Sequence, residues 1–150
     1  MAQTLTRLLT HIVFSTKGRR PWIRREIESE LYRYIRGTLS NLHSPCIEVN
    51  GTEDHLHFLT SQDKNIAVSQ LLCEVKKSSS KWIKTKGREW RDFQWQDGYA
   101  AFSVSESHLE RVRRYIARQK QHHRRMSFRD ELLQLLKRHR VQYDERYLWD

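Results

Sequence analysis

The segment that decides the fold is CIEVNGTEDHLHFLTS, residues 46–61. Its first part, Cys46 to Asn50, is predicted to form a short strand, and Asp54 to Ser61 is predicted to form the returning strand. Asn50-Gly51 lies between them and is a strong signal for a hairpin turn. A pair of antiparallel strands in the middle of the chain is therefore the frame around which the other segments are placed.

The flanking segments give a β-α-β-β-α-β order. Apolar spacing and turn residues predict strands over 4–16 and 99–104, and helices over 22–42, 65–86, 105–123 and 127–140. A capping box formed by Ser107 and Glu110 is expected to start the third of these helices. The order predicts an α+β fold of the ferredoxin-like, split βαβ type: an antiparallel sheet with helices on one face, plus C-terminal helices.

Length and composition limit the class of protein. A chain of 150 residues suits one domain, so we expect a single domain over 1–150. The 28 Lys and Arg against 18 Asp and Glu leave a net charge of +10, which in a folded domain indicates a polyanionic partner. No apolar run approaches the roughly 20 residues of a membrane span, and the N-terminus lacks the apolar core of a signal peptide. We therefore expect a cytoplasmic protein without membrane contact.

Basic residues gather in two segments. One contains Lys76, Lys77 and Lys81 with tryptophans interleaved, a pattern that serves phosphate contact and base stacking. The other contains Arg111, Arg114 and Arg118 without any acid between residues 111 and 129. These six residues are the candidate contacts to nucleic acid.

Two histidines of the returning strand share a face. Side chains alternate along a strand, so His55 and His57 point the same way while Leu56 and Phe58 point the other way. Their Cβ atoms are expected to lie roughly 7 Å apart, which lets both imidazoles reach one metal ion. The pair alone fits a metal site and also fits two ordinary strand histidines.

The helix after the last strand offers a second candidate. Tyr115 and Gln119 form an i, i+4 pair on the flank of the stripe made by Leu109, Val112 and Ile116. A reactive group belongs in such a position if the helix packs beside the sheet. A tyrosine at the boundary between core and solvent is the ordinary alternative.

Taken together, these motifs resemble a known family. His55-Leu56-His57 matches the His-hydrophobe-His (HUH) motif, and residues 115–119 match the motif Tyr-x-x-x-Gln. The chain is similar to the one-tyrosine HUH transposases of the insertion-sequence 200/605 type. Residues 10–16, 95–105 and 143–149 agree as well, so the resemblance covers nearly the whole chain.

The resemblance implies a DNA transposase that cleaves and rejoins single-stranded DNA at hairpin-marked ends. Tyr115 would be the nucleophile and would form a 5′-phosphotyrosine. His55, His57 and Gln119 would bind Mg²⁺ or Mn²⁺, and the metal and nearby arginines would favour the phenolate. Rejoining would need neither ATP nor another nucleotide cofactor. The resemblance also implies a homodimer in which the two sheets merge.

Two alternatives remain beside this hypothesis. A non-catalytic ferredoxin-like module for single-stranded nucleic acid would need the basic residues but neither Tyr115 nor the histidines. A domesticated relative would cleave chromosomal repeat hairpins without mobilising an element.

Several further residues have ordinary interpretations. His11 is expected to be a packed strand histidine, and His122 and His123 are expected to be charges at a helix end. Asp54 suits either a support for one histidine or an exposed turn residue. Cys46 and Cys73 are expected to be small core residues.

Overall fold

The protein folds around a four-stranded antiparallel sheet, seen in a computed structural model that describes residues 2–150. The strands are β1 (Leu9–Ser15), β2 (Cys46–Gly51), β3 (His55–Ser61) and β4 (Ala100–Val104). The helices are α1 (Arg25–Asn41), α2 (Val68–Ile83), α3 (Leu109–Ala117), α4 (Gln119–His122) and α5 (Phe128–Arg138). The spatial order β2-β3-β1-β4, with every pair antiparallel, confirms the ferredoxin-like α+β fold.

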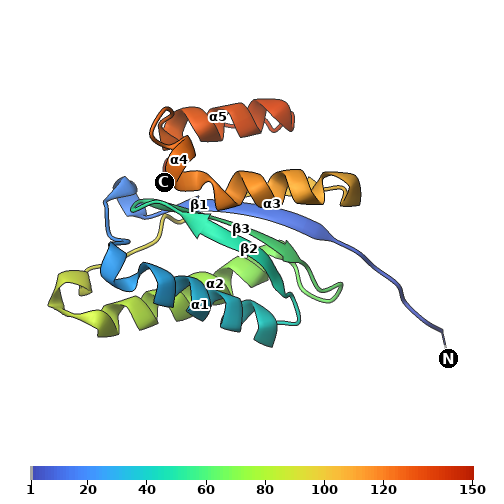
Figure 1. The fold of residues 1–150 in the computed structure, drawn as a ribbon, viewed down its shortest axis with the longest axis horizontal. Coiled ribbons are helices and arrows are strands. Elements are labelled where there is room, and N and C mark those ends of the chain that lie inside the picture. The colour runs from blue at the N-terminus through green and yellow to red at the C-terminus, as the bar shows by residue number, and fades with distance from the viewer. Residues whose placement is uncertain (1) are drawn as a thin grey trace.

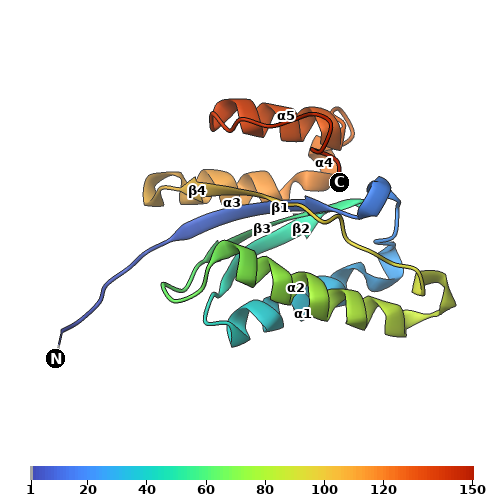
Figure 2. The same ribbon diagram turned by 180° about the vertical axis from the view of Figure 1, so that it is seen from behind.

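Helices cover both faces of the sheet, whereas the sequence predicted one covered face. The helices α1 and α2 lie on one side, and α3, α4 and α5 lie on the other (Figures 1 and 2). Ile12, Phe14, Leu56 and Phe58 belong to the core under α1 and α2. Val13, from the alternate position of β1, instead packs with Phe102 and α5 in a second core. Alternate side chains of β1 therefore pack into two cores, one on each face of the sheet.

Some predicted bounds are wrong, for local reasons. The first strand begins at Leu9 because this residue pairs with Ser61 and Val104, where β3 and β4 end. The predicted capping box is absent: α3 starts after His108, without a side-chain cap. The helix predicted to run to residue 123 is interrupted at Arg118, whose backbone angles are φ −102° and ψ 19°.

The cysteines differ from each other in their environment. Cys46 is half-buried against the core under α1 and α2, whereas Cys73 is exposed on α2, so the prediction of a core position was wrong for Cys73.

No helix within residues 2–150 combines the length and apolarity that a membrane span requires.

The hairpin turn falls later than predicted. Gly51 belongs to β2, where it pairs with Leu56, and the reversal occurs over Thr52, Glu53 and Asp54. The amide of Thr52 donates to the carbonyl oxygen of His55 at 3.1 Å. A Cβ atom on Gly51 would collide with that same carbonyl oxygen. Glycine is needed here because two backbone segments approach closely.

We expect Gly51→Ala to lower the melting temperature. The collision forces the backbone next to His55 to move, and overpacking of this kind costs about 1–3 kcal/mol. In a chain of this size each kcal/mol corresponds to roughly 2–4 °C. The control is Gly37→Ala, an exposed position inside α1 where an added Cβ meets nothing within 4 Å. It should raise stability by about 0.5–1 kcal/mol. Equal melting temperatures for the two variants would contradict the close approach at Gly51.

Candidate active site and metal centre

The two histidines of β3 lie buried on the face covered by α3, α4 and α5. His55 and His57 are both fully buried, and their ring centroids lie 5.3 Å apart, which confirms the predicted shared face. His11 on the adjacent β1 places Nε2 2.9 Å from Nδ1 of His57. It is therefore a packed strand histidine, as predicted, and it also touches the candidate site.

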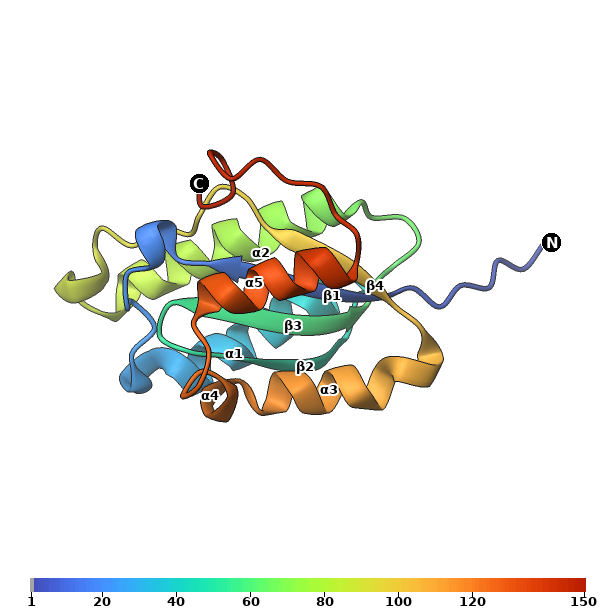
Figure 3. The ribbon, with the colours of Figure 1, turned by 90° about the horizontal axis from the view of Figure 1, so that it is seen from above.

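Tyr115 and Gln119 reach the same place from α3 and α4. Gln119 is fully buried, with its Oε1 3.2 Å from Nε2 of His55. The side-chain amide of Asn50 on β2 donates to the carbonyl oxygens of Ile116 and Ala117, at 3.1 and 3.0 Å. These hydrogen bonds fasten the end of α3 to the edge of the sheet, beside which it runs in Figure 3. The two predicted motifs thus meet within one chain.

A carboxylate from α5 lies at the centre of this group. Glu131 is 1% exposed, and its Oε1 accepts hydrogen bonds at 2.9 Å from both His57 Nε2 and His123 Nε2. Its Oε2 accepts one at 3.0 Å from Nε2 of Gln119 and another from the hydroxyl of Tyr115. One buried carboxylate therefore joins the predicted nucleophile to the predicted metal ligands.

Sequence reasoning missed Glu131 and misjudged His123. His123 was expected to be a helix-end charge, but it turns inward against His55, with ring centroids 4.4 Å apart. The available signal for Glu131 was its place within the apolar stripe of α5, between Phe128 and Leu132. A lone acid among buried apolar positions requires a polar partner.

Asp54 supports the cluster from the turn before β3. Its Oδ1 lies 2.7 Å from Nδ1 of His55 and also accepts a hydrogen bond from the hydroxyl of Thr52 at 2.9 Å. Burial opposes a charge on His55, but the hydrogen bonds to Asp54 and Glu131 prevail and raise its pKa. Of the two interpretations left open for Asp54, the geometry favours the support for a histidine.

The other titratable groups are shifted in opposite directions. Burial lowers the pKa of His57 to about 4, so this imidazole is neutral at physiological pH and available as a ligand. Burial opposes ionisation of Glu131, yet its contacts with His123, His55 and His57 hold its pKa well below the usual range. Burial and the negative charge of Glu131 together raise the pKa of Tyr115. Without a metal ion, burial and this acid together keep the phenol protonated. The predicted phenolate assumed a bound metal as well as the arginines, so it stays a prediction.

The donor set suits a divalent metal. The ligand atoms of His55, His57, His123 and Glu131 all lie within 4.8 Å of one another, in a largely buried position. Three imidazole nitrogens and one carboxylate oxygen are ordinary ligands of divalent cations. The amide oxygen of Gln119, the predicted third ligand, lies beside this set.

The predicted DNA contacts separate into two groups. Arg111, Arg114 and Arg118 line a hollow of about 340 Å³ together with Tyr115 and His122. They therefore lie on one side of the candidate nucleophile.

The lysines lie on α2, which covers the opposite face of the sheet (Figure 1). Lys77 and Lys81 are exposed there. The ammonium group of Lys76 donates to the carbonyl oxygens of Gln96 and Gly98, at 2.9 and 2.6 Å, so Lys76 braces the loop before β4.

Comparison with known proteins gives the family of the chain and solved structures with a similar fold. Residues 4–119 match the model of the family described as "Transposase IS200 like". The fold is similar to that of a candidate transposase from Deinococcus radiodurans R1, with a TM-score of 0.63 and 18% identity over 79% of this chain and 95% of that one. It is also similar to a REP-associated tyrosine transposase bound to a REP hairpin, with a TM-score of 0.60 and 13% identity over 82% of this chain and 74% of that one. Comparison with the curated proteins gave no match. The family model spans most of the chain, and so the protein belongs to the insertion-sequence 200-like transposases.

Proposed function

We propose that this transposase cleaves and rejoins single-stranded DNA through a covalent bond to Tyr115. The observation that carries the proposal is the hydrogen bond from the Tyr115 hydroxyl to Glu131, the carboxylate that also contacts His57 and His123. A potential nucleophile and a metal-binding cluster thus share one buried group. Nucleophilic catalysis requires this proximity between the attacking atom and the groups that activate it.

The proposed step exchanges one phosphoester bond for another. The phenolic oxygen of Tyr115 attacks the scissile phosphorus, the new O–P bond forms, and the bond from phosphorus to the 3′ oxygen breaks. The phenolic proton passes to solvent water, and the departing 3′ oxygen takes up a proton. The products are a 5′-phosphotyrosine and a free 3′-OH. Reversal with a 3′-OH rejoins the strand and needs no ATP, because the phosphotyrosyl ester keeps the bond energy.

A divalent cation held by His55, His57, His123 and Glu131 would offset the negative charge that develops on the phosphate oxygens. We propose Mg²⁺ or Mn²⁺, with Gln119 as a further ligand. Three imidazoles in the donor set favour Mn²⁺, since Mg²⁺ prefers oxygen ligands more strictly.

The proposed substrate is single-stranded DNA that carries a hairpin. Arg111, Arg114 and Arg118 line one hollow with Tyr115 and are suited to phosphate contact. A solved structure with this fold holds a REP hairpin, which supports a hairpin as the recognised form.

The predicted homodimer also stays a proposal, to be tested by light scattering. All the side chains of the candidate site come from one chain, so catalysis in cis is geometrically available.

The buried cluster argues against the non-catalytic module. Exposed Lys and Arg suffice for binding a strand, whereas burying a carboxylate and several imidazoles opposes folding unless each finds a partner. A domesticated nuclease would use the same site as a mobile transposase. DNA ends with subterminal hairpins beside the gene would favour the mobile element.

Tyr115→Phe should abolish strand cleavage and the covalent adduct while leaving hairpin binding nearly unchanged. The substitution removes one hydroxyl and keeps the ring in place. The assay incubates the protein with hairpin-bearing single-stranded DNA and metal, and then counts the adducts that resist denaturation. Tyr99→Phe is the matched control, because Tyr99 is 40% exposed and lies outside the cluster. Cleavage by Tyr115→Phe with loss in Tyr99→Phe would move the nucleophile to Tyr99.

His57→Ala should eliminate metal-dependent cleavage, and Gln119→Ala should weaken it less. His57 is fixed on a strand among three other donors, whereas water can partly replace the amide oxygen of Gln119. The measurements are the cleavage rate and the heat of metal binding against Mg²⁺ and Mn²⁺ concentration. The control is His43→Asn, at an exposed position with φ +54° that Asn tolerates. An unchanged metal dependence in His57→Ala would show that the histidines are ordinary strand residues.

Binding should weaken steeply with salt. Each phosphate contact on a single strand contributes about 0.7 to the slope of log affinity against log salt concentration. Replacing Arg111, Arg114 and Arg118 together by Gln should reduce the slope by about two units. The double variant Lys77→Gln, Lys81→Gln shows whether the α2 face also contacts DNA. A flat plot for the unaltered protein would exclude the nucleic-acid hypothesis itself.

A further inference from the structure

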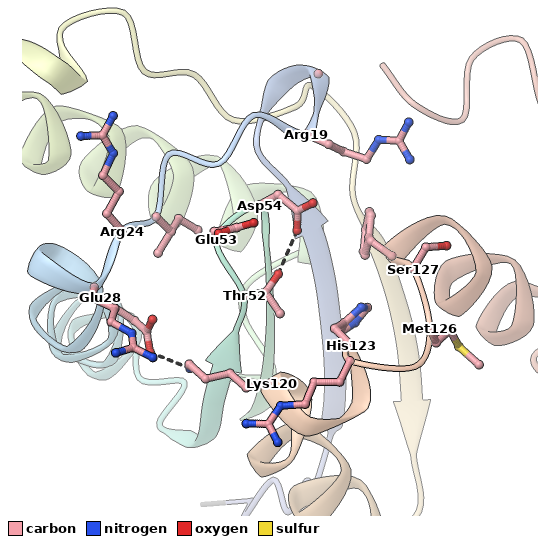
Figure 4. Close-up of a pocket in the computed structure, with 15 residues that line it drawn as sticks. Arg19, Arg24, Glu28, Thr52, Glu53, Asp54, Lys120, His123, Met126 and Ser127 are labelled. Atoms are coloured by element: carbon pink, nitrogen blue, oxygen red, sulfur yellow. Dashed lines mark hydrogen bonds and ion pairs between the residues drawn. The ribbon is translucent and has the colours of Figure 1, made fainter.

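A second pocket meets the metal-binding cluster on a side that Tyr115 does not line. It is formed by the start of α1, the turn between β2 and β3, and the connection from α4 to α5, and has a volume of about 720 Å³. Figure 4 shows Asp54, Thr52 and His123 in its middle, with the ion pair of Lys120 and Glu28 along one side and Arg19 across from it. A volume of this size accommodates a nucleotide-sized ligand.

The pocket and Tyr115 approach the cluster through different groups. His123 and Asp54 line the pocket, and so does Phe128, whose ring stacks on His55 with centroids 4.3 Å apart. Tyr115 instead lines two other hollows, one with Arg111, Arg114 and Arg118 and one with His11 and Arg138. The Glu131 carboxylate spans the two sides, since Oε1 contacts His123 and Oε2 contacts Tyr115.

The geometry of phosphoryl transfer relates the position of Tyr115 to the position of the leaving strand. The attacking and leaving oxygens lie roughly in line on opposite sides of the phosphorus. A scissile phosphate held at the cluster, with the phenolic oxygen on one side, would place the departing 3′ oxygen on the other side. The nucleotides joined to that 3′ oxygen would then extend toward the pocket.

The charge of the pocket suits such a strand. Five basic residues line it against three acidic ones: Arg19, Arg24, Arg25, Lys120 and Arg124 against Glu28, Glu53 and Asp54. Lys120 already pairs with Glu28 at 2.6 Å, and Asp54 is occupied by His55 and Thr52. Within residues 2–150, Arg25 and Arg124 form no ion pair, so their charges remain available to phosphate.

Two further arginines are held in place by aromatic rings. The guanidinium of Arg24 lies 5.5 Å from the ring centroid of Trp90, and that of Arg19 lies 5.0 Å from that of Trp149. Stacking of this kind restricts a long side chain, so less freedom is lost when it contacts a phosphate or a base.

We infer that this pocket holds the cleaved strand by its 3′-terminal nucleotides after Tyr115 has displaced the 3′ oxygen. The inference rests on the proposed function and adds where the leaving strand stays. Its retention keeps the 3′-OH beside the phosphotyrosine, which favours resealing over escape.

The test separates cleavage from resealing. A hairpin-bearing substrate carries one fluorophore upstream and another downstream of the cleaved bond, and the protein carries Arg24→Gln with Arg124→Gln. We expect adduct formation close to that of the unaltered protein. The upstream fragment should leave the adduct about tenfold faster, and resealing should fall in proportion. The matched control is Arg33→Gln with Arg91→Gln, two exposed arginines outside the pocket.

The binding of a strand to the pocket can also be measured without the cleavage reaction. In the Tyr115→Phe background, a short single-stranded oligonucleotide with a free 3′-OH is titrated at several salt concentrations. Arg24→Gln with Arg124→Gln should lower the slope of log affinity against log salt by about 1.4 units. Unchanged slope together with unchanged fragment release would overturn the inference, as would slower adduct formation with normal release, because the pocket would then hold the other flank. Absence of adduct from the unaltered protein overturns the proposed function, and the titration still decides whether the pocket binds a strand.

Discussion

A single buried carboxylate, that of Glu131, connects the C-terminal helices to the sheet. Isolated in the interior, a carboxylate would strongly oppose folding. Here it accepts hydrogen bonds from His57, His123, Gln119 and the Tyr115 hydroxyl. These donors belong to β3, α3, α4 and the connection that follows α4. Hydrogen bonds to a charged group each contribute about 1.5–3 kcal/mol, so the loss of one of the four would destabilise the fold. The position of α5 and the geometry of the candidate site therefore depend on the same contacts.

The alternation of side chains along β3 makes this possible in so short a segment. Leu56 and Phe58 belong to the apolar core beneath α1 and α2, while His55 and His57 face α5. The stability of the sheet thus comes mainly from one face, and the other face can carry polar groups. The same alternation in β1 places His11 beside His57 and leaves Ile12 in the core.

The sequence predicted the strands, the sheet type and the two motifs because each depends on short-range periodicity. The shared face of His55 and His57 follows from a period of two, and the predicted pairing of Tyr115 with Gln119 used a helical period near four. The two residues meet although the helix is interrupted between them at Arg118. The sequence did not predict that His123 and Glu131 join the site. Their positions depend on the break at Arg118 and on the turn into α5, which no periodic pattern encodes. The hairpin turn moved by two residues because close backbone contact, and not turn geometry, is what requires Gly51.

The carboxylate of Glu131 has two opposing effects in the candidate site. It belongs to the donor set that could hold a metal ion, and it adds to burial in raising the pKa of Tyr115. An ionised carboxylate beside the phenol stabilises the fold and holds the proton on Tyr115, the proposed nucleophile. Attack on phosphorus needs the opposite, a phenol that gives up its proton readily. Positive charge brought to the cluster would weaken the influence of the carboxylate on the phenol. The pKa of His57, near 4, keeps its imidazole neutral, which is the charge state that ligation requires. The carboxylate that organises the folded site is thus also the group through which a metal would govern the reactivity of Tyr115.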